Sequence, residues 1–338
     1  MSRSKRFVLA TSGVGEAFGG IGVVSAHVQR VLSKKGEVRL WKHPPRWLRA
    51  LRASVFAAQA WAGALSCPSF VLYEHVDLAR IHRWVPGLRQ VPYGVFLHGV
   101  EVWRPQTPAH RAALTNATLL LANSHFTAKR AKEINPWLSQ PQVAWLGVQV
   151  PALELAVRKP VALVVSRLDA SEHAKNHFAV LEAWQLISKQ VLDAELVIVG
   201  DGTGRAALQQ RVEALNLSRV RFLGRISNDD RDAWYQKSRA LLFPSSGEGF
   251  GLVAAEAAAH GMAVLGLRGT VLDELFPNGM TWVEQVTGQA VAEAALPLLQ
   301  DAALAQARGL QLRARVRAEF TDERFEERVL NALSPWVD

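Results

Sequence analysis

The 338-residue sequence has one cysteine and no long apolar run, and both scarcities exclude classes of protein. A single cysteine, Cys67, cannot form an internal disulfide, which fits a reducing compartment. The longest apolar stretch, residues 53–65, is shorter than the roughly 20 residues that a helix needs to span a bilayer. The apolar run Phe7–Ala10 after the basic start is too short for a signal peptide. The sequence therefore predicts a cytoplasmic protein.

Acidic residues are scarce in the first part of the chain. Residues 1–158 contain 20 Lys and Arg against 7 Asp and Glu, a net charge of +13. Residues 159–338 contain 19 against 23, a net charge of −4, and seven of the eleven tryptophans precede them. A basic region rich in tryptophan favours an acidic substrate, an anionic membrane or nucleic acid. We expect no nucleic-acid partner, because no zinc-finger or RNP motif accompanies the charge.

The dinucleotide-binding fingerprint GxGxxG is also missing. Two glycine turns follow apolar runs and precede helices, Gly19-Gly20-Ile21-Gly22 and Gly200-Asp201-Gly202-Thr203-Gly204, and neither has its spacing. Each turn either brings its backbone close to a phosphate or sugar, as glycine permits, or is a plain tight turn. The missing fingerprint disfavours an oxidoreductase or epimerase that uses a nicotinamide cofactor.

Short apolar runs alternate with amphipathic helices along the chain, which predicts parallel sheets covered by helices on both faces. The length favours two domains, and the irregular segment 147–160, with two prolines, is the expected linker. Two such domains facing one another leave a cleft at the carboxyl ends of their strands, where ligands bind. The expected strands are 6–12, 70–75, 93–99, 118–124, 161–166, 194–200, 220–224, 240–245 and 262–267.

Three charged or titratable side chains follow expected strands. Arg167 and Lys175 flank a loop after the strand 161–166, where they either bind a diphosphate or are ordinary solvated cations. His98 ends the strand 93–99, in the sequence HGVEVW. It is either exposed at the ligand edge or an ordinary core or surface histidine.

The segment EGFGLVAAEAAAHG, residues 248–261, is the most specific signal. A glycine turn leads into an alanine-rich helix, so the N–H groups of Phe250, Gly251 and Leu252 can hold a phosphate or a sugar hydroxyl. Glu248 precedes the turn, and Glu256 lies on the helix, where an isolated acid is costly unless it is paired. Glu256 either binds the two hydroxyls of a ribose or forms a buried salt bridge to the neighbouring domain.

Together these residues resemble the retaining glycosyltransferases of family 4, which have the GT-B fold. The resemblance rests on Arg167 with Lys175 and on Glu248 with Glu256, and it covers most of the chain. It implies an α/β protein of two Rossmann-like doubly wound domains facing across a cleft. Residues 1–155 would bind the acceptor and residues 156–318 the nucleotide sugar, with a helix at 319–338 that packs back on the first domain.

The resemblance also implies residue roles. Arg167 and Lys175 would neutralise the leaving diphosphate, Glu256 would bind the ribose, and Glu248 would hold donor-sugar hydroxyls together with the backbone around Phe250 and Gly251. His98 would contact the donor sugar. The remaining donor contacts implied or expected are Gly19, Gly20, Gly22, Gly200, Gly202, Arg225, Ile226 and Leu252.

The implied reaction moves a hexose, with mannose or glucose leading, from a nucleotide sugar to an acceptor hydroxyl in polysaccharide or glycolipid assembly. The family retains the anomeric configuration by same-face attack, so no enzyme nucleophile is expected. Arg167 and Lys175 would take the place of a metal in stabilising the leaving diphosphate, and no cofactor is expected. GDP-mannose and UDP-glucose are the leading donors, and the acceptor is a glycan or a lipid-linked sugar. The basic stretch 39–65 either binds an anionic membrane, which would place the protein peripherally at the inner face of the cell membrane, or is a buried domain helix with a solvated basic edge.

Some positions depart from the family pattern. Ala174 stands where an aromatic residue is frequent, and Ala263 where proline is usual. The phosphate-binding element near residue 270 has the sequence RGTVLDEL, with Gly269, Thr270 and Val271 as its candidate contacts. The alternative is a non-catalytic nucleotide-sugar-binding protein, against which the retained Arg, Lys and Glu residues argue. The sequence does not indicate an oligomeric state.

Overall fold

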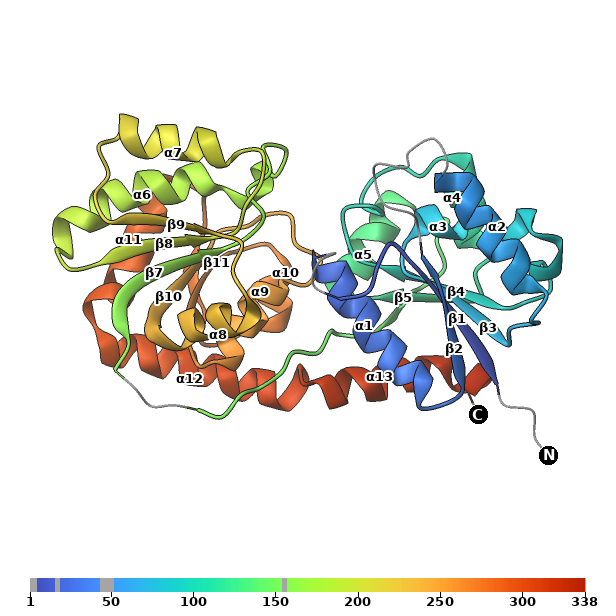
Figure 1. The fold of residues 1–338 in the computed structure, drawn as a ribbon. Helices are drawn as coiled ribbons and strands as arrows, with labels where there is room; N and C mark the ends of the chain where they lie inside the picture. Colours follow the sequence, from blue (N-terminus) through green and yellow to red (C-terminus); the bar gives the residue numbers. More distant parts are fainter. Residues whose placement is uncertain (1–4, 16–18, 43–51, 154–156, 338) are drawn as a thin grey trace. The chain divides into compact units, whose positions relative to one another are not determined.

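The structure, a computed structural model, describes residues 5–15, 19–42, 52–153 and 157–337. The chain forms two compact units, each built around a six-stranded sheet (Figure 1). Unit 1 contains Met1–Gly147 together with Asp322–Asp338, and unit 2 contains Val148–Thr321. The chain therefore leaves unit 1 after Gly147, earlier than the expected linker boundary at 155, and returns to it at Asp322.

The sheet of unit 1 has the order β2-β1-β3-β4-β5-β6, and all its strand pairs are parallel. The edge strand β2 was not predicted, because its charged residues break the apolar run and it pairs only with β1. The strands of unit 1 are β1 (Arg6–Thr11), β2 (Glu37–Lys42), β3 (Phe70–Tyr73), β4 (Tyr93–Leu97), β5 (Leu119–Ala122) and β6 (Gln142–Val143).

Helices cover this sheet, and α1 packs against α13 within unit 1 (Figure 1). Helix α1 begins at Gly19, which corrects the expectation that the glycine turn precedes the helix: Gly19, Gly20 and Gly22 form its first turn. The helices are α1 (Gly19–Ser33), α2 (Arg52–Ala64), α3 (Val76–Ala79), α4 (Pro108–Thr115), α5 (His125–Ile134) and α13 (Asp322–Val337), with the 3₁₀ turns η3 (His82–Trp84) and η4 (Pro86–Leu88).

The sheet of unit 2 is also parallel throughout, with the order β12-β11-β10-β7-β8-β9. The five expected strands of this region are all present, and a short edge strand, β12, adds a sixth. The strands are β7 (Lys159–Val165), β8 (Glu195–Val199), β9 (Val220–Gly224), β10 (Ser238–Phe243), β11 (Ala263–Leu267) and β12 (Thr281–Val283).

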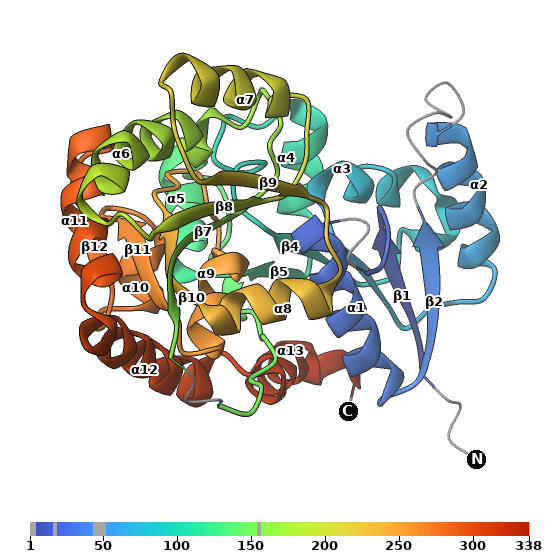
Figure 2. The same cartoon turned by 60° about the vertical axis from the view of Figure 1, so that its left-hand side comes forward.

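Helices α6, α7 and α11 lie on one face of this sheet, and α8 and α9 lie on the other (Figures 1 and 2). The 3₁₀ turn η5 (His173–Lys175) precedes α6. The helices of unit 2 are α6 (His177–Gln190), α7 (Arg205–Ala214), α8 (Asn228–Lys237), α9 (Leu252–Ala259), α10 (Val271–Leu275), α11 (Gly288–Gln300) and α12 (Ala302–Glu319).

The central strands are buried on both faces, which explains their unbroken apolar runs. In β4, all five residues Tyr93–Leu97 are buried. In β7, the run Val161–Val165 is buried, and Ala162 and Val164 belong to the cluster that α6 and α11 complete. The predicted class, two doubly wound parallel α/β domains, is thereby confirmed. None of the helices in the described part of the chain has the length and apolar character that crossing a bilayer requires.

Candidate active site

The sheet of unit 2 reverses its strand order beside β7. The chain runs from β7 outward to β8 and β9, and then returns to β10 on the other side of β7. Open α/β sheets bind ligands at such a switch point, outside the carboxyl ends of the strands. The loop after β7 carries Arg167 and Lys175, and the loop after β10 carries Glu248. The fold therefore brings three residues predicted from the sequence to one edge of unit 2.

Hydrogen bonds tie these two loops together. The backbone N–H of Ser246 donates to the carbonyl of Ala174 at 2.9 Å, and the side-chain amide of Asn176 donates to the carbonyl of Pro244 at 2.8 Å. Asn176 has a left-handed backbone with φ of 57°, which ends η5 and starts α6. Lys175 is consequently held against the second loop.

Both predicted phosphate-binding cations are paired with carboxylates. The Nζ of Lys175 contacts Oε1 of Glu248, which also accepts a hydrogen bond from Ser245 Oγ at 2.9 Å. The side chains of Lys175 and Glu248 are only 17% and 16% exposed, so little water screens this pair. Arg167 pairs with Glu172 of its own loop, but its side chain is 67% exposed. A bound diphosphate would find one cation fixed and one free to reorient.

Glu256 lies on α9 and has partners within unit 2. Its Oε2 accepts a hydrogen bond from the Tyr235 hydroxyl at 3.0 Å and lies 3.6 Å from Nε of Arg231. Burial, reinforced by the Glu256 charge, raises the pKa of Tyr235 well above its usual value, so the phenol keeps its proton. Both partners belong to α8, so this salt bridge forms inside the unit rather than to the neighbouring domain.

The turn Gly200–Gly204 packs directly on the Arg167 loop. A Cβ at Gly200 would lie 1.8 Å from the carbonyl oxygen of Ser166, and one at Gly202 would lie 2.5 Å from the backbone nitrogen of Asp169. Leu168 donates its N–H to Asp201 O at 3.0 Å and accepts from Gly204 N–H at 2.7 Å. These contacts explain the glycines by close backbone packing. A ligand is not needed to account for them.

Other donor-binding candidates also lie near the carboxyl edge of this sheet. The segment with Arg225 and Ile226 follows β9 and adjoins the Gly200 turn, because Gly200 N–H donates to Gly224 O at 2.8 Å. Phe250 is buried, and its ring packs against Phe320 with 5.7 Å between ring centroids. Gly251 and Leu252 then start α9, as the sequence predicts.

The turn before α10 already has an acidic partner. The backbone N–H of Gly269 donates to Oδ2 of Asp273 at 2.6 Å, and Thr270 caps the helix by accepting from Leu272 N–H at 3.4 Å. Arg268 pairs with the same Asp273 at 3.0 Å. A phosphate at this turn would have to displace the Asp273 carboxylate.

In unit 1, His98 lies immediately after β4. Its Nε2 is 2.8 Å from the backbone carbonyl of Glu74, and its ring stacks on Phe96 at 4.9 Å between centroids. A carbonyl only accepts hydrogen bonds, so Nε2 carries a proton and the neutral ring has Nδ1 as an acceptor. Burial lowers the pKa of His98, although the charges of Glu101 and Glu74 oppose this effect. His98 is therefore neutral near pH 7.

Two buried acids beside His98 were missed from the sequence. Glu101 accepts hydrogen bonds from the backbone N–H groups of His98 and Gly99, the latter at 3.1 Å. These bonds fix the turn after β4. Glu74 follows β3 and accepts hydrogen bonds from side chains at the end of β1 and on α1. The available signal was an acid soon after an apolar strand: Glu74 directly follows FVLY, and Glu101 comes four residues after the end of YGVFL.

The glycines at the start of α1 have room around them. A Cβ at Gly19 would meet no atom of the described residues within 4 Å, and both Gly19 and Gly20 are exposed. Gly22 is buried, and its carbonyl accepts the N–H of Gly15 at 2.8 Å. The first turn of α1 can therefore approach a ligand through its backbone.

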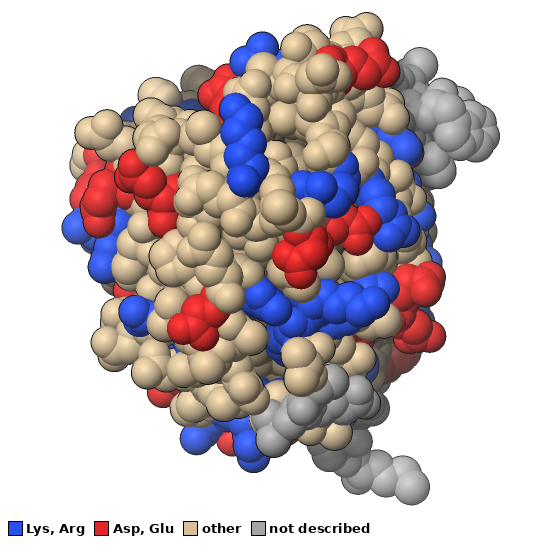
Figure 3. Space-filling view, turned by 90° about the vertical axis from the view of Figure 1, so that its left-hand side faces the viewer, with Lys and Arg blue, Asp and Glu red and all other residues tan. Residues whose placement is uncertain are grey.

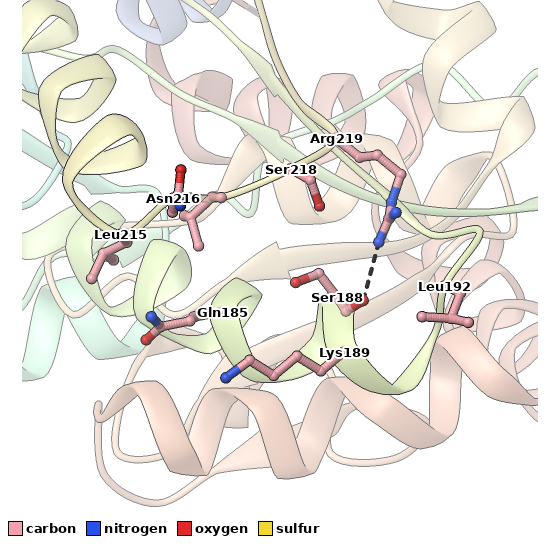
Figure 4. A pocket seen from close by; sticks show the side chains of 9 residues that line it. Gln185, Ser188, Lys189, Leu192, Leu215, Asn216, Ser218 and Arg219 are labelled. Atoms are coloured by element: carbon pink, nitrogen blue, oxygen red, sulfur yellow. Dashed lines mark hydrogen bonds between the residues drawn. The ribbon is translucent and has the colours of Figure 1, made fainter.

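Charges of both signs cover the surface near unit 2. Lys and Arg side chains gather in a stripe near the middle of the face drawn in Figure 3, with Asp and Glu side chains around them. Elsewhere on unit 2, cations have acidic partners: Arg221 pairs with Glu195 at 3.0 Å and Arg211 with Glu182 at 2.9 Å. A hollow of about 600 Å³ lies between the end of α6 and the segment before β9. Lys189 is among the residues that line it, and none of the candidate site residues is (Figure 4).

The chain was compared with known families and proteins. Residues 149–315 match the model of the family described as "Glycosyl transferases group 1", which spans nearly all of unit 2. The glycogen synthase of Mycobacterium tuberculosis is 27% identical over 305 residues, covering 86% of this chain and 68% of that protein. The lipopolysaccharide core biosynthesis mannosyltransferase LpcC of Rhizobium leguminosarum bv. viciae is 35% identical over 144 residues, 42% of this chain and 39% of that protein.

Solved structures share the fold over the whole chain. A crystal structure of Anabaena Alr3699/HepE in complex with UDP and glucose has a TM-score of 0.78 at 16% identity and covers 97% of this chain and 99% of its own. Sucrose-phosphate synthase from Thermosynechococcus elongatus has a TM-score of 0.80 at 18% identity, covering 98% of each chain. The protein is a glycosyltransferase with the GT-B fold. The match to the group 1 glycosyl transferase family lies in its unit 2.

Proposed function

We propose that this glycosyltransferase moves a hexose from a nucleoside-diphosphate sugar to an acceptor hydroxyl, with retention of the anomeric configuration. The observation that carries the proposal is the largely buried Lys175–Glu248 pair at the switch point of unit 2, with Arg167 on the same edge. A leaving diphosphate develops negative charge, and preorganised cations stabilise such charge most effectively where water is excluded. The assembled glycan is a polysaccharide or glycolipid.

In this mechanism each proposed residue has one task. Lys175 and Arg167 hold the diphosphate, and neither a metal nor an enzyme nucleophile takes part. Glu256 accepts hydrogen bonds from the ribose hydroxyls. Glu248 accepts hydrogen bonds from hydroxyls of the donor sugar and also orients Lys175. The leaving phosphate oxygen takes the acceptor proton on the same face of the sugar.

Unit 1 contributes His98, whose neutral ring accepts a hydrogen bond from a hydroxyl of the donor sugar. Such a contact is consistent with Nε2 being occupied by the carbonyl of Glu74, because Nδ1 is then the acceptor. The first turn of α1 offers backbone N–H groups to the donor phosphates or the acceptor.

The donor sugar is glucose or mannose in this proposal. UDP-glucose is supported by the fold shared with HepE, a crystal structure of which is described as a complex with UDP-glucose. GDP-mannose is supported by the local similarity to the mannosyltransferase LpcC. A thermal-shift screen with UDP, GDP, ADP and TDP tests the base, because a ligand of the native state raises the melting temperature, and at equal concentration the tighter ligand raises it more. No selective shift, together with no sugar transfer, would leave the proposal without support.

A position at the inner face of the cell membrane is the second part of the proposal. Helix α2 buries Phe56 and Ala60, whereas Val55, Trp61 and the following Leu65 are exposed, so apolar side chains occur on both of its sides. Exposed tryptophan and leucine beside cations are typical of surfaces that bind anionic lipid. Residues 43–51 of the basic stretch 39–65 lie outside the described residues.

Vesicle sedimentation tests this membrane contact. We expect Trp61→Ala to reduce the fraction bound to anionic vesicles at low salt, while Leu192→Ala, which removes an exposed apolar side chain of unit 2, leaves it unchanged. If both variants bind the vesicles equally, Trp61 does not contribute to the membrane contact. No binding by the unchanged protein would end the membrane part of the proposal.

A further inference from the structure

Glu74 is a buried acid that the proposed mechanism does not use. It follows β3 directly, and its side chain is 3% exposed. Within the part of the chain that the structure describes, no Lys or Arg forms an ion pair with it. Burial of a carboxylate is costly unless hydrogen bonds replace the lost water. The structure must therefore supply these hydrogen bonds from polar groups.

Four donors surround the Glu74 carboxylate. Oε1 accepts from the backbone N–H of Ser12 at 3.3 Å and from its hydroxyl at 2.6 Å. Oε2 accepts from the hydroxyl of Ser25 at 2.5 Å and from that of Thr11. A carboxylate has about four lone-pair positions, and the four surrounding donor groups match that number.

These donors come from the end of β1, from Ser12 directly after it, and from α1. Thr11 ends β1, and its Oγ1 accepts the backbone N–H of Gly13 at 3.0 Å and lies within hydrogen-bonding distance of both Glu74 Oε2 and the carbonyl oxygen of Gly13. Ser25 lies on α1, about one and a half turns after the exposed glycines of its first turn. Glu74 therefore fixes both ends of the turn that presents the N-terminus of α1.

The main chain of the same residue holds His98. The carbonyl of Glu74 accepts from Nε2 of His98 at 2.8 Å, and the N–H of Glu74 donates to Ala10 O at 2.9 Å. In the sheet, β3 lies between β1 and β4, so residue 74 stands between the ends of the strands that carry the two groups. This location is the switch point of unit 1, the counterpart of the site in unit 2.

We infer that Glu74 is a positioning residue for sugar transfer, which holds the first turn of α1 and the ring of His98 in one fixed arrangement. The inference rests on the proposed function, since it assigns Glu74 to the same reaction. In this role Glu74 acts through the turn and the His98 ring, since its own side chain is 3% exposed. It acts because displacing a catalytic group by about 1 Å can cost on the order of a hundredfold in rate.

The variant Glu74→Gln tests this inference. The amide group of glutamine places N–H donors against the hydroxyl and N–H donors around it, so the turn and the residue-74 carbonyl that holds His98 shift. We expect kcat to fall on the order of tenfold to a hundredfold, with the donor KM nearly unchanged because unit 2 holds the diphosphate. The thermal stability of the variant is measured beside the kinetics.

A second readout follows the His98 ring by NMR through a pH titration. The titratable groups that face His98 are Glu101, Glu74 and His75, and the first two favour its protonated form. Removal of the Glu74 charge is therefore expected to move the His98 titration to lower pH. The variant Ser25→Ala keeps the charge, so it leaves this titration unchanged while it lowers kcat severalfold by loosening α1. Ser25→Ala also keeps the test open if Glu74→Gln does not fold.

Tyr93→Phe is the matched control. It removes a buried hydrogen bond of unit 1, from Tyr93 Oη to Ala113 O at 2.6 Å, away from the Glu74 carboxylate. If Glu74→Gln or Ser25→Ala changes stability like the control and leaves kcat and the His98 titration as in the unchanged protein, the inference is overturned. The NMR titration does not need a substrate. A failure of the proposed function, seen as no transfer by the unchanged protein, is therefore distinguishable from a failure of this inference.

Discussion

Replacing Gly200 with alanine tests whether the glycine-rich turn of unit 2 serves backbone packing. Gly200 has φ of 130°, a backbone conformation that residues with a side chain rarely adopt. A Cβ added there would lie 1.8 Å from the carbonyl oxygen of Ser166. Backbone strain of this kind costs about 1–3 kcal/mol, and forcing extra atoms into a packed site costs about the same again. We therefore expect Gly200→Ala to lower the free energy of unfolding by about 4 kcal/mol.

Gly269→Ala is the matched control, because it lies in the same unit and has strain without a clash. Gly269 has φ of 73°, and no atom of the described residues lies within 4 Å of its added Cβ. A left-handed alanine costs roughly 1–2 kcal/mol. Urea unfolding of the three proteins, followed by a signal from unit 2, measures both differences.

The same clash has a functional consequence. To relieve this contact, the Ser166 backbone must move. The displacement is larger than a binding site tolerates in the position of its residues, and Arg167 moves with Ser166. Nucleotide-sugar affinity should therefore fall in Gly200→Ala even where the protein remains folded. If Gly200→Ala is no less stable than Gly269→Ala, the packing explanation is refuted. If it is stable but loses donor binding, the turn contacts the ligand itself.

Three further predictions concern the charged groups of the unit 2 site. Lys175→Met leaves Glu248 buried without its cation, so we expect the free energy of unfolding to fall by about 2–3 kcal/mol in urea and donor affinity to fall in calorimetry; unchanged stability would contradict the burial of this pair. Burial, with the nearby Lys175 charge, lowers the pKa of His177 to about 4. The unfolded chain therefore binds a proton below about pH 6.5 that the native protein does not bind, and stability falls by up to about 3 kcal/mol between pH 6.5 and pH 4; His177→Gln should flatten this pH profile, and an unaltered profile would contradict the assignment. Glu172→Gln frees Arg167 from an exposed ion pair, so diphosphate affinity at low salt should rise a few-fold in calorimetry; a weaker affinity would mean that Glu172 orients Arg167 instead.

The sequence predicted the sheet of unit 2 well because its strands are buried on both faces. Runs such as 161–165 and 240–243 are apolar without interruption, and their separation by amphipathic helices leaves few alternatives. The proximity of Arg167, Lys175 and Glu248 follows from the strand order, since the loops after β7 and β10 flank the switch point.

The sequence was less informative where one residue acts through distant partners. Glu74 looks like any acid after a strand, and its importance comes from hydroxyls up to 63 positions away along the chain. Helix α1 was predicted to begin after its glycines, because glycine is a poor helix former. In the structure the exposed first turn tolerates Gly19 and Gly20, and the helix begins earlier.

Calorimetric titration of nucleotide sugars into the unchanged protein and into Glu256→Gln tests the central claim most directly. The amide keeps an oxygen for Tyr235 but loses the charge that accepts ribose hydroxyls, and hydrogen bonds to charged groups contribute about 1.5–3 kcal/mol. We predict that one nucleotide sugar binds the unchanged protein and binds Glu256→Gln at least tenfold more weakly. Equal affinity for the two proteins, or no binding of any nucleotide sugar, would contradict the donor site assigned to unit 2.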